Sequence, residues 1–231
     1  FADVAPLVAD DEVLIDLNSR NRRLSGFWLA DQAGTPPDAR LSGKRAVILD
    51  GEDAFVNMLR HILARMGISS NVVRHEDYAD GVLDGFDLVI VGPGPGDPRD
   101  DSSAKMANLR AAVAWLLANQ KPFLAVCLGH QALCHTLGIP LAYKDIVFQG
   151  TQSSIVINGR PERVGFYNTF VGRVGPDVAL PAGVSVDADA ETGDVHGVAG
   201  PHYRGVQFHA ESILTERGFD IVHDLVSVVL L

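Results

Sequence analysis

The sequence has only two cysteines, Cys127 and Cys134, in 231 residues. Two cysteines are too few for a disulfide framework or a structural zinc site. If both lie on one helix, a rise of about 1.5 Å per residue separates them by about 10 Å, beyond the roughly 7 Å limit for a disulfide. We therefore expect two free thiols in a reducing, cytoplasmic compartment, and no metal bound by this chain.

Long apolar runs and positive charge are also scarce. The longest apolar run, 111–118, falls well short of the roughly 18 residues that span a bilayer. Lys and Arg number 19 against 29 Asp and Glu, which gives a formal charge of -10. Because nucleic acid and anionic membranes bind basic faces, neither is expected as a partner. With 47% hydrophobic and 21% charged residues, the composition is typical of a globular protein.

The N-terminus lacks both a methionine and the features of an export signal. Phe1 begins the chain, and acidic residues at positions 10–12 follow, where a secretory signal would carry an apolar core behind basic residues. The chain is then either an excerpt from a longer polypeptide or a processed chain, and we expect the excerpt.

Residues 1–44 differ in character from the rest of the chain. The polar cluster at 18–23 and the pair Pro36-Pro37 lie between short apolar stretches, which is typical of a linker between domains. The stretch 24–29, Leu-Ser-Gly-Phe-Trp-Leu, is too apolar for a free tail. We expect it to pack either on its own domain, residues 45–231, or on a missing neighbour.

From residue 45 onward, short apolar strands alternate with helices that carry apolar residues at helical spacing. This alternation predicts an α/β fold with a mostly parallel sheet covered by helices on both faces. After residue 150 the pattern changes to β-rich segments separated by turn residues. The predicted strands are 46–49, 71–73, 86–91, 123–126, 154–157 and 203–209, and the predicted helices are 55–66, 106–117 and 219–229.

Functional groups in open parallel sheets gather at the carboxyl ends of the strands. Three predicted strand ends carry unusual residues: a glycine- and proline-rich loop at 92–98, the segment Cys127 to Gln131, and the segment His209 to Glu211. The loop at 92–98 is too rich in proline for a phosphate cradle and lacks the lysine of a phosphate-binding motif. The three segments are therefore the candidates for chemistry.

Cys127 lies where a predicted strand runs into a predicted helix, with the small residues Ala125 and Gly129 two positions to either side. This is the pattern of a nucleophile elbow, in which a strained turn exposes the side chain and the helix N-terminus favours negative charge on the sulfur. The alternative is a buried cysteine that acts as a small hydrophobe, and composition alone leaves both open.

A nucleophilic cysteine needs a base, and His209 is the best placed of the eight histidines. Glu211 follows two residues later, so a period of two can place its carboxylate beside the imidazole, where it would hold the tautomer. His130 and His202 are rivals on position alone. Three further histidines are predicted to be structural or solvated: His61, His75 and His223.

The loop at 92–98 suits an oxyanion donor. The backbone N–H of Gly94, together with that of Leu128 beside the nucleophile, is predicted to meet the oxygen of a tetrahedral intermediate, which is worth about 3 kcal/mol per donor. Taken alone, a loop of glycine and proline is a rigid turn.

Together and in this order, the three segments resemble those of the class I (triad) glutamine amidotransferases, which include the glutaminase halves of chorismate-using synthases. The resemblance covers residues 44–231 and implies the flavodoxin-like fold of that family. The matching segments read Gly92-Pro93-Gly94-Pro95-Gly96-Asp97-Pro98, Cys127-Leu128-Gly129-His130-Gln131 and Gln207-Phe208-His209-Ala210-Glu211-Ser212.

The resemblance implies a role for each matching residue. Cys127 would be the nucleophile, His209 the acid and base, and Glu211 the residue that orients His209. Gly94 and Leu128 would donate to the oxyanion. The substrate glutamine would be held by Gln131 and by the backbone near Thr169 and Phe170.

Several departures narrow the subfamily. Residues 166–170, Phe-Tyr-Asn-Thr-Phe, stand where anthranilate-type glutaminases have Tyr-His-Ser-Leu, and residues 148–150, Phe-Gln-Gly, stand where they have His-Gly-Lys. Ala210 replaces a common proline. With the linker at 1–44, these features are similar to the C-terminal domain of phenazine-type aminodeoxyisochorismate synthases. In that family a synthase domain precedes the glutaminase on the same chain.

The resemblance implies that this domain hydrolyses glutamine through a cysteinyl thioester and passes ammonia to a chorismate-aminating synthase, of the aminodeoxyisochorismate or anthranilate type. Mg²⁺ is expected in that synthase and no cofactor in the glutaminase, and the sequence leaves open a homodimer of the full-length protein. Two other functions stay open: a γ-glutamyl hydrolase of the same fold, and a non-catalytic regulatory or scaffold domain. Intact Cys127, His209 and Glu211 favour an enzyme over a scaffold.

Overall fold

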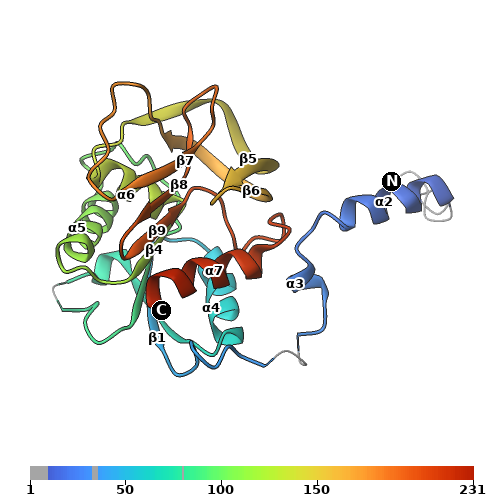
Figure 1. The fold of residues 1–231 in the computed structure, drawn as a ribbon, viewed down its shortest axis with the longest axis horizontal. Helices are drawn as coiled ribbons and strands as arrows, with labels where there is room; N and C mark the ends of the chain where they lie inside the picture. Colours follow the sequence, from blue (N-terminus) through green and yellow to red (C-terminus); the bar gives the residue numbers. More distant parts are fainter. Residues whose placement is uncertain (1–9, 33–35, 80) are drawn as a thin grey trace.

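The computed structural model describes residues 10–32, 36–79 and 81–231. Phe1, on which the expectation of a longer polypeptide was based, lies outside the described residues. The main sheet has the strand order β2-β1-β3-β4-β9-β8-β7. Its strands from β2 to β9 pair in parallel, and β8 and β7 are added by antiparallel pairing (Figure 1). Its strands are β1 (Arg45–Asp50), β2 (Ser69–Arg74), β3 (Leu88–Val91), β4 (Phe123–Val126), β7 (Ser185–Ala188), β8 (Val195–Gly200) and β9 (Tyr203–Val206).

The central strands are continuous apolar runs because both of their faces are buried. All four residues of β3 and of β4 are buried. In β1 the side chains alternate: Ala46 and Ile48 join the core on one face of the sheet, and Val47 and Leu49 join the core on the other. Burial on both faces is the usual state of parallel strands between two helical layers.

Helices cover both faces of the sheet (Figure 1). The core on one face contains residues of α4 (Phe55–Arg65) and α7 (Gly218–Leu230), and the core on the other contains residues of α5 (Ala104–Ala118) and α6 (Leu128–Thr136). Helix α4 buries Val56, Leu59, Ile62 and Leu63, each worth about 1.5–3 kcal/mol of transfer free energy. The predicted α/β fold is confirmed.

The β-rich half is a long hairpin that forms a second sheet, β5 (Leu141–Ile157) with β6 (Arg160–Gly172). Its tight turn is Asn158-Gly159, with φ of 50° and 71°, which are the backbone angles that hairpin turns of this length require. The predicted strand at 154–157 is only the end of β5. Residues 141–153 were not predicted because only one of them, Lys144, is buried and the stretch carries no continuous apolar signal.

The last predicted strand, 203–209, is shorter in the structure. Strand β9 ends at Val206, and the chain then leaves the main sheet, since the backbone N–H of His209 donates to the carbonyl of Gly165 in β6 at 2.9 Å. The third predicted strand begins at Leu88 rather than Phe86. The remaining predicted elements agree with the structure to within a few residues.

The segment before the domain contains two helices that the sequence did not predict. Helix α2 (Asp11–Asn21) has no buried residue and projects away from the domain (Figure 1). Residues 23–29, here called the strap, include the short helix α3 (Gly26–Leu29) and pack on this domain, with Phe27 and Trp28 against its core. Of the two arrangements that the sequence left open for this stretch, the structure shows packing on its own domain.

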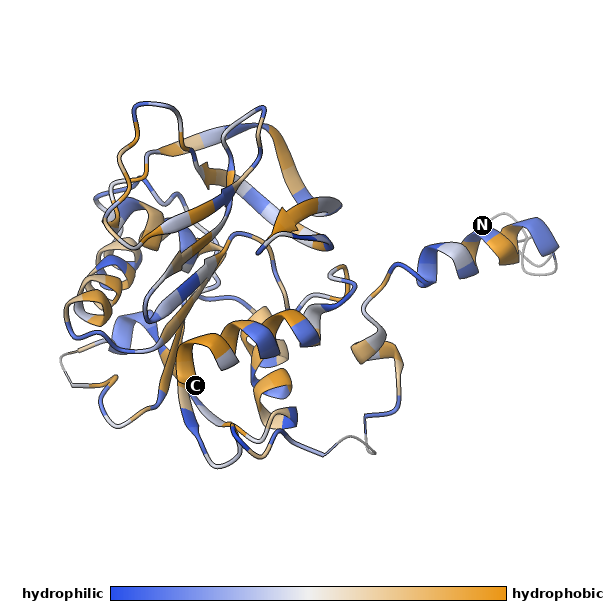
Figure 2. Cartoon of the chain, in the orientation of Figure 1, coloured by the Kyte–Doolittle hydropathy of each residue, from blue (hydrophilic) through white to orange (hydrophobic). Residues whose placement is uncertain are grey.

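The distribution of apolar and polar residues matches the layers of the fold. Apolar residues gather on the inner strands and on the faces of the helices that cover them, and many polar residues lie in the loops (Figure 2). Within the described residues, no helix is long and apolar enough to cross a membrane.

Candidate active site

Cys127 lies at a sharp corner between β4 and α6. Its backbone has φ 50° and ψ -104°, a conformation that a residue with a side chain rarely adopts outside functional sites. Its N–H donates to the carbonyl of Val206 at 2.9 Å, and its carbonyl accepts from the N–H of Gln131 at 3.0 Å. The strained turn that the sequence predicted is therefore present and is held from both sides.

The corner requires glycines around it. A Cβ on Gly129 would lie 2.0 Å from the carbonyl oxygen of Val91, and a Cβ on Gly92 would lie 2.6 Å from that of Val126. The ends of β3 and β4 thus approach the first turn of α6 more closely than any side chain allows.

His209 and Glu211 form a buried pair at the carboxyl end of the sheet. His209 Nδ1 lies 2.8 Å from Glu211 Oε1, and the two side chains are 1% and 0% exposed. The other carboxylate oxygen of Glu211, Oε2, is buried without a hydrogen-bond partner. The imidazole packs against a tilted Phe55 ring and edge-to-face against Tyr167, with ring centroids 4.6 and 5.1 Å away.

The surroundings of His209 favour its charged form. Burial by itself opposes an imidazolium, but negative charge on Glu211 and on Cys127, with hydrogen bonds to both, raises the pKa of His209 well above its ordinary value. His209 therefore bonds the carboxylate and lines the same cavity as the cysteine. We call residues 209–215, which carry this pair, the triad loop.

Several residues that the sequence singled out meet around one cavity of about 330 Å³. Cys127 and His209 lie on its wall together with the oxyanion candidate Gly94. Leu128 follows Cys127 as the first residue of α6, so its N–H is one of the donors that a helix leaves unpaired. The cavity is lined by Asp53, Phe55, Gly94, Pro95, Gly96, Cys127, Gln131, Gln149, Tyr167, Asn168, Thr169, Phe170 and His209.

The loop that carries Gly94 is fixed against β1. The N–H of Gly51 donates to the carbonyl of Pro93 at 3.0 Å, and a Cβ on Gly94 would lie 2.1 Å from the carbonyl oxygen of Gly51. Glycine is therefore the residue that lets this loop reach the cavity wall.

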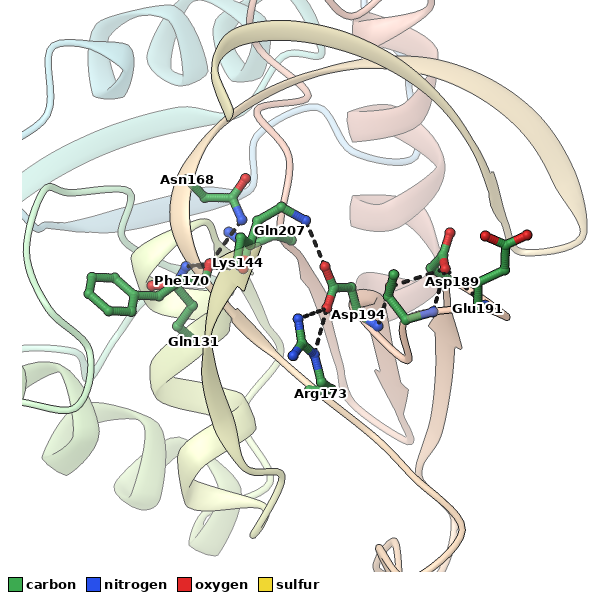
Figure 3. Close-up of polar contacts among 10 residues, drawn as sticks. Gln131, Lys144, Asn168, Phe170, Arg173, Asp189, Glu191, Asp194 and Gln207 are labelled. Carbon is green, nitrogen blue, oxygen red and sulfur yellow. Dashed lines mark hydrogen bonds and ion pairs between the residues drawn. The ribbon is translucent and has the colours of Figure 1, made fainter. Parts of the chain in front are cut away.

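The predicted substrate-binding residues lie on the cavity wall and are ordered by amide contacts. Gln131 Nε2 and Asn168 Nδ2 both donate to the carbonyl of Phe170, at 2.7 and 2.8 Å (Figure 3). Gln131 also donates to Gln207 Oε1 at 3.0 Å. Thr169 lies between these residues on the wall.

Sequence reasoning missed Gln207, whose Nε2 lies 3.8 Å from the Cys127 sulfur. Gln207 stands two residues before His209, so the same period of two could have found it. Phe55 and Tyr167 were missed as neighbours of His209, and no signal in the sequence links them to it.

The rival histidines lie elsewhere. His130 is fully buried, with its Nε2 3.5 Å from Cys134, and burial lowers its pKa to about 3. The ring of His202 lies 6.2 Å from that of Phe123, at the opposite end of β4 from Cys127. The other three histidines that were predicted to be structural have protein contacts: His61 with Gln32, His75 with Glu52 and His223 with Asp38.

A buried ion cluster ties the hairpin to the edge of the main sheet. Lys144 of β5 pairs with Asp194 at 2.6 Å, and Arg173 pairs with the same carboxylate at 2.9 Å (Figure 3). The side chains of Lys144 and Asp194 are 10% and 6% exposed. Salt screens such a buried pair much less than a surface pair.

Comparison with known proteins places this geometry in context. The family model described as glutamine amidotransferase class-I matches residues 47–228. An "Anthranilate synthase, phenazine specific" of Pseudomonas chlororaphis is 43% identical over 218 residues, which are 93% of this chain and 34% of that protein. An "Aminodeoxychorismate synthase" of Streptomyces pristinaespiralis is 35% identical over 75% of this chain and 25% of its own length. The chain thus spans about a third or less of these relatives.

A solved structure shares the fold. A glutamine amidotransferase from Thermotoga maritima superposes with a TM-score of 0.59, covering 80% of this chain and 90% of that one. At 16% identity, this similarity speaks for the fold alone.

Proposed function

The chain belongs to the class I glutamine amidotransferases, and we propose that it hydrolyses glutamine at Cys127 and supplies the ammonia to a synthase that aminates chorismate. The observation that carries the proposal is one buried histidine, His209, which bonds Glu211 at 2.8 Å and lines the same cavity as Cys127. The assigned roles are Cys127 as nucleophile, His209 as acid and base, and Glu211 as the group that orients it.

The proposed reaction begins with attack by the Cys127 thiolate on the amide carbon of glutamine. Backbone N–H groups of Gly94 and Leu128 stabilise the oxygen of the tetrahedral intermediate. The imidazolium of His209 gives its proton to the departing nitrogen, so ammonia leaves and a glutamyl thioester forms. Neutral His209 then takes a proton from water, which attacks the thioester and releases glutamate and the thiolate. Gln131, Thr169 and Phe170 are assigned to hold the substrate.

The acceptor is proposed from the relatives, and a surface for the synthase from exposed apolar residues of β5. Both relatives are synthases, about three times as long as this chain or longer, and one has chorismate in its name. Exposed apolar residues of β5, Tyr143 at 55%, Ile146 at 72% and Val147 at 39%, lie along the strand that leads to the cavity-lining Gln149. Apolar patches of this kind mark surfaces that contact a partner. The Mg²⁺ that such a synthase would use belongs to the synthase, and no step assigned here passes through it.

The cellular setting is proposed from the nucleophile. Cys127 must stay a free thiol to react, and both cysteines are free in the structure. A reducing compartment such as the cytoplasm provides that state.

Labelling with a glutamine-analogue electrophile, diazo-oxo-norleucine, tests the glutaminase. We expect one adduct, at Cys127, which glutamine prevents and which mass spectrometry locates. Cys134 is the internal control, because burial raises the pKa of its thiol above the ordinary value and leaves it unreactive. An unlabelled Cys127 in the whole protein, with chorismate present, would contradict the proposal. Transfer of ¹⁵N from amide-labelled glutamine to the aminated product would separate an amidotransferase from a γ-glutamyl hydrolase.

The dependence of the reaction on pH tests the role of Glu211. Because the charge of Glu211 helps to raise the pKa of His209, the imidazolium persists into alkaline solution and activity ends when it loses its proton. In Glu211→Gln this pKa falls, so the alkaline limb of kcat/KM for glutamine moves to lower pH, and kcat falls by about a hundredfold. Glu216→Gln, which changes an exposed carboxylate on the neighbouring stretch, is the control and keeps the wild-type profile. An unchanged alkaline limb in Glu211→Gln would remove Glu211 from the mechanism.

A further inference from the structure

The strap, residues 23–29, is bound directly to the triad loop, residues 209–215. The indole Nε1 of Trp28 donates to the backbone carbonyl of Glu211 at 2.9 Å. The backbone N–H of Ser25 donates to the carbonyl of Ile213 at 2.8 Å. Gln152 of β5 bridges the two segments, since its side-chain amide donates to the carbonyl of Arg23 in the strap at 2.6 Å and to that of Leu214 in the triad loop at 2.8 Å. A segment far away in the sequence therefore holds the loop that carries the catalytic pair.

The strap has a firm base for this contact. Phe27 stacks on Phe219 of α7 with ring centroids 4.8 Å apart, and Trp28 lies 5.4 Å from the ring of His61 in α4. Ser25 is fully buried. The indole N–H is thus presented to the triad loop by rings packed on two helices of the domain.

The position of the Glu211 carboxylate depends on the backbone of its loop. One carboxylate oxygen bonds His209, and the other is buried with no side chain or backbone donor to hold it. Elsewhere in the loop, the Thr215 hydroxyl donates to the carbonyl of His209 at 2.6 Å and the Ser212 N–H donates to the same carbonyl at 3.1 Å. The contact on the peptide of Glu211 itself comes from Trp28.

We propose that Trp28 is a positioning residue, which fixes the peptide of Glu211 so that its carboxylate meets His209, and that the strap thereby couples the segment before the domain to the reactivity of Cys127. This inference rests on the proposed function of the triad. Helix α2, which has no buried residue, leads into the strap, so a displacement of that segment is passed to Glu211 through Trp28.

The test is the Trp28→Phe variant of the full-length protein. Phenylalanine keeps an aromatic ring against His61 but has no N–H for the carbonyl of Glu211. We expect kcat for glutamine to fall about fivefold to tenfold with KM unchanged. A fall of this size corresponds to the loss of one buried hydrogen bond that supports the transition state. Trp115→Phe is the matched control: it makes the same exchange of indole for phenyl in α5, on the opposite face of the sheet, and is expected to keep kcat within twofold.

Two further measurements separate positioning from general support of the fold. In a double variant with Glu211→Gln, the Trp28→Phe change should have no further effect on kcat, because both act through one carboxylate. Titration of His209 by NMR should give a lower pKa in Trp28→Phe than in the wild type, with Cys127 and Tyr167, the other titratable groups around the imidazole, left in place.

The outcomes are distinct. If Trp28→Phe lowers only the melting temperature and leaves kcat and the titration of His209 unchanged, the strap is merely structural and the proposal fails. If the effects of Trp28→Phe and Glu211→Gln multiply in the double variant, Trp28 does not act through Glu211. If the wild type shows no glutaminase activity and His209 still titrates lower in Trp28→Phe, the positioning role stands and the proposed function of the triad fails instead.

Discussion

Replacing Cys127 with alanine is expected to lower glutamine-dependent product formation by at least about 10⁴-fold, because no other side chain in the cavity can form the thioester. Amination with free ammonium should continue at close to the wild-type rate in the whole protein, since the ammonia would enter after the step that is lost. The measurement is product formation with glutamine and with an ammonium salt, at saturating chorismate.

The control for this variant is Cys134→Ala, which removes the other thiol. Cys134 is buried beside Gly172 and makes no contact with the cavity, so its loss should leave the use of glutamine within about twofold of the wild type. Glutamine-dependent activity that survives in Cys127→Ala would show that another nucleophile acts, and the proposed mechanism would be wrong.

Gly129→Ala is expected to destabilise the protein by about 3 kcal/mol or more. The added Cβ would lie 2.0 Å from the carbonyl oxygen and 2.5 Å from the carbonyl carbon of Val91, and both are backbone atoms of a buried strand. Either β3 or the first turn of α6 must shift, and such overpacking costs free energy of unfolding. The measurement is the free energy of unfolding from urea titration, with soluble yield as a first indication.

The same variant should also lose glutaminase activity, because a shift of α6 moves Cys127 and the N–H of Leu128 together. Gly175→Ala is the matched control, since a Cβ there meets no atom within 4 Å. It should change the free energy of unfolding by no more than about 0.5 kcal/mol. If the two variants proved equally stable, the close approach of Val91 to Gly129 would be disproved.

The layered fold was predictable because buried parallel strands produce a simple pattern in the sequence. Strands such as β3 and β4 are covered on both faces, so they read as unbroken apolar runs between amphipathic helices. Helix α2 left no such trace: nothing in it is buried, and its start is set by a local cap, the carboxylate of Asp10 accepting from the N–H groups of Glu12 and Val13. The first half of β5 was missed for a related reason, since only one of its residues, Lys144, is buried.

The residues of the candidate site also fall into a group that the sequence could predict and a group that it could not. The strand-to-helix corner at Cys127 and the spacing of His209 and Glu211 are local patterns, and from them the sequence could predict which residues the structure places together. The contacts of Trp28 with Glu211 and of Phe55 with His209 join segments more than a hundred residues apart. They depend on how the strap and α4 pack, which no short pattern specifies.

The proposed nucleophile and base are held by different sheets. Cys127 ends a strand of the main sheet, whereas the backbone of His209 is bonded to Gly165 of the hairpin, and the hairpin is tied to the main sheet through Lys144 and Asp194. A small rotation of the hairpin therefore changes the distance between sulfur and imidazole without breaking a hydrogen bond inside either sheet. The geometry of the proposed active site is therefore set by the contact between the two sheets as much as by either sheet alone.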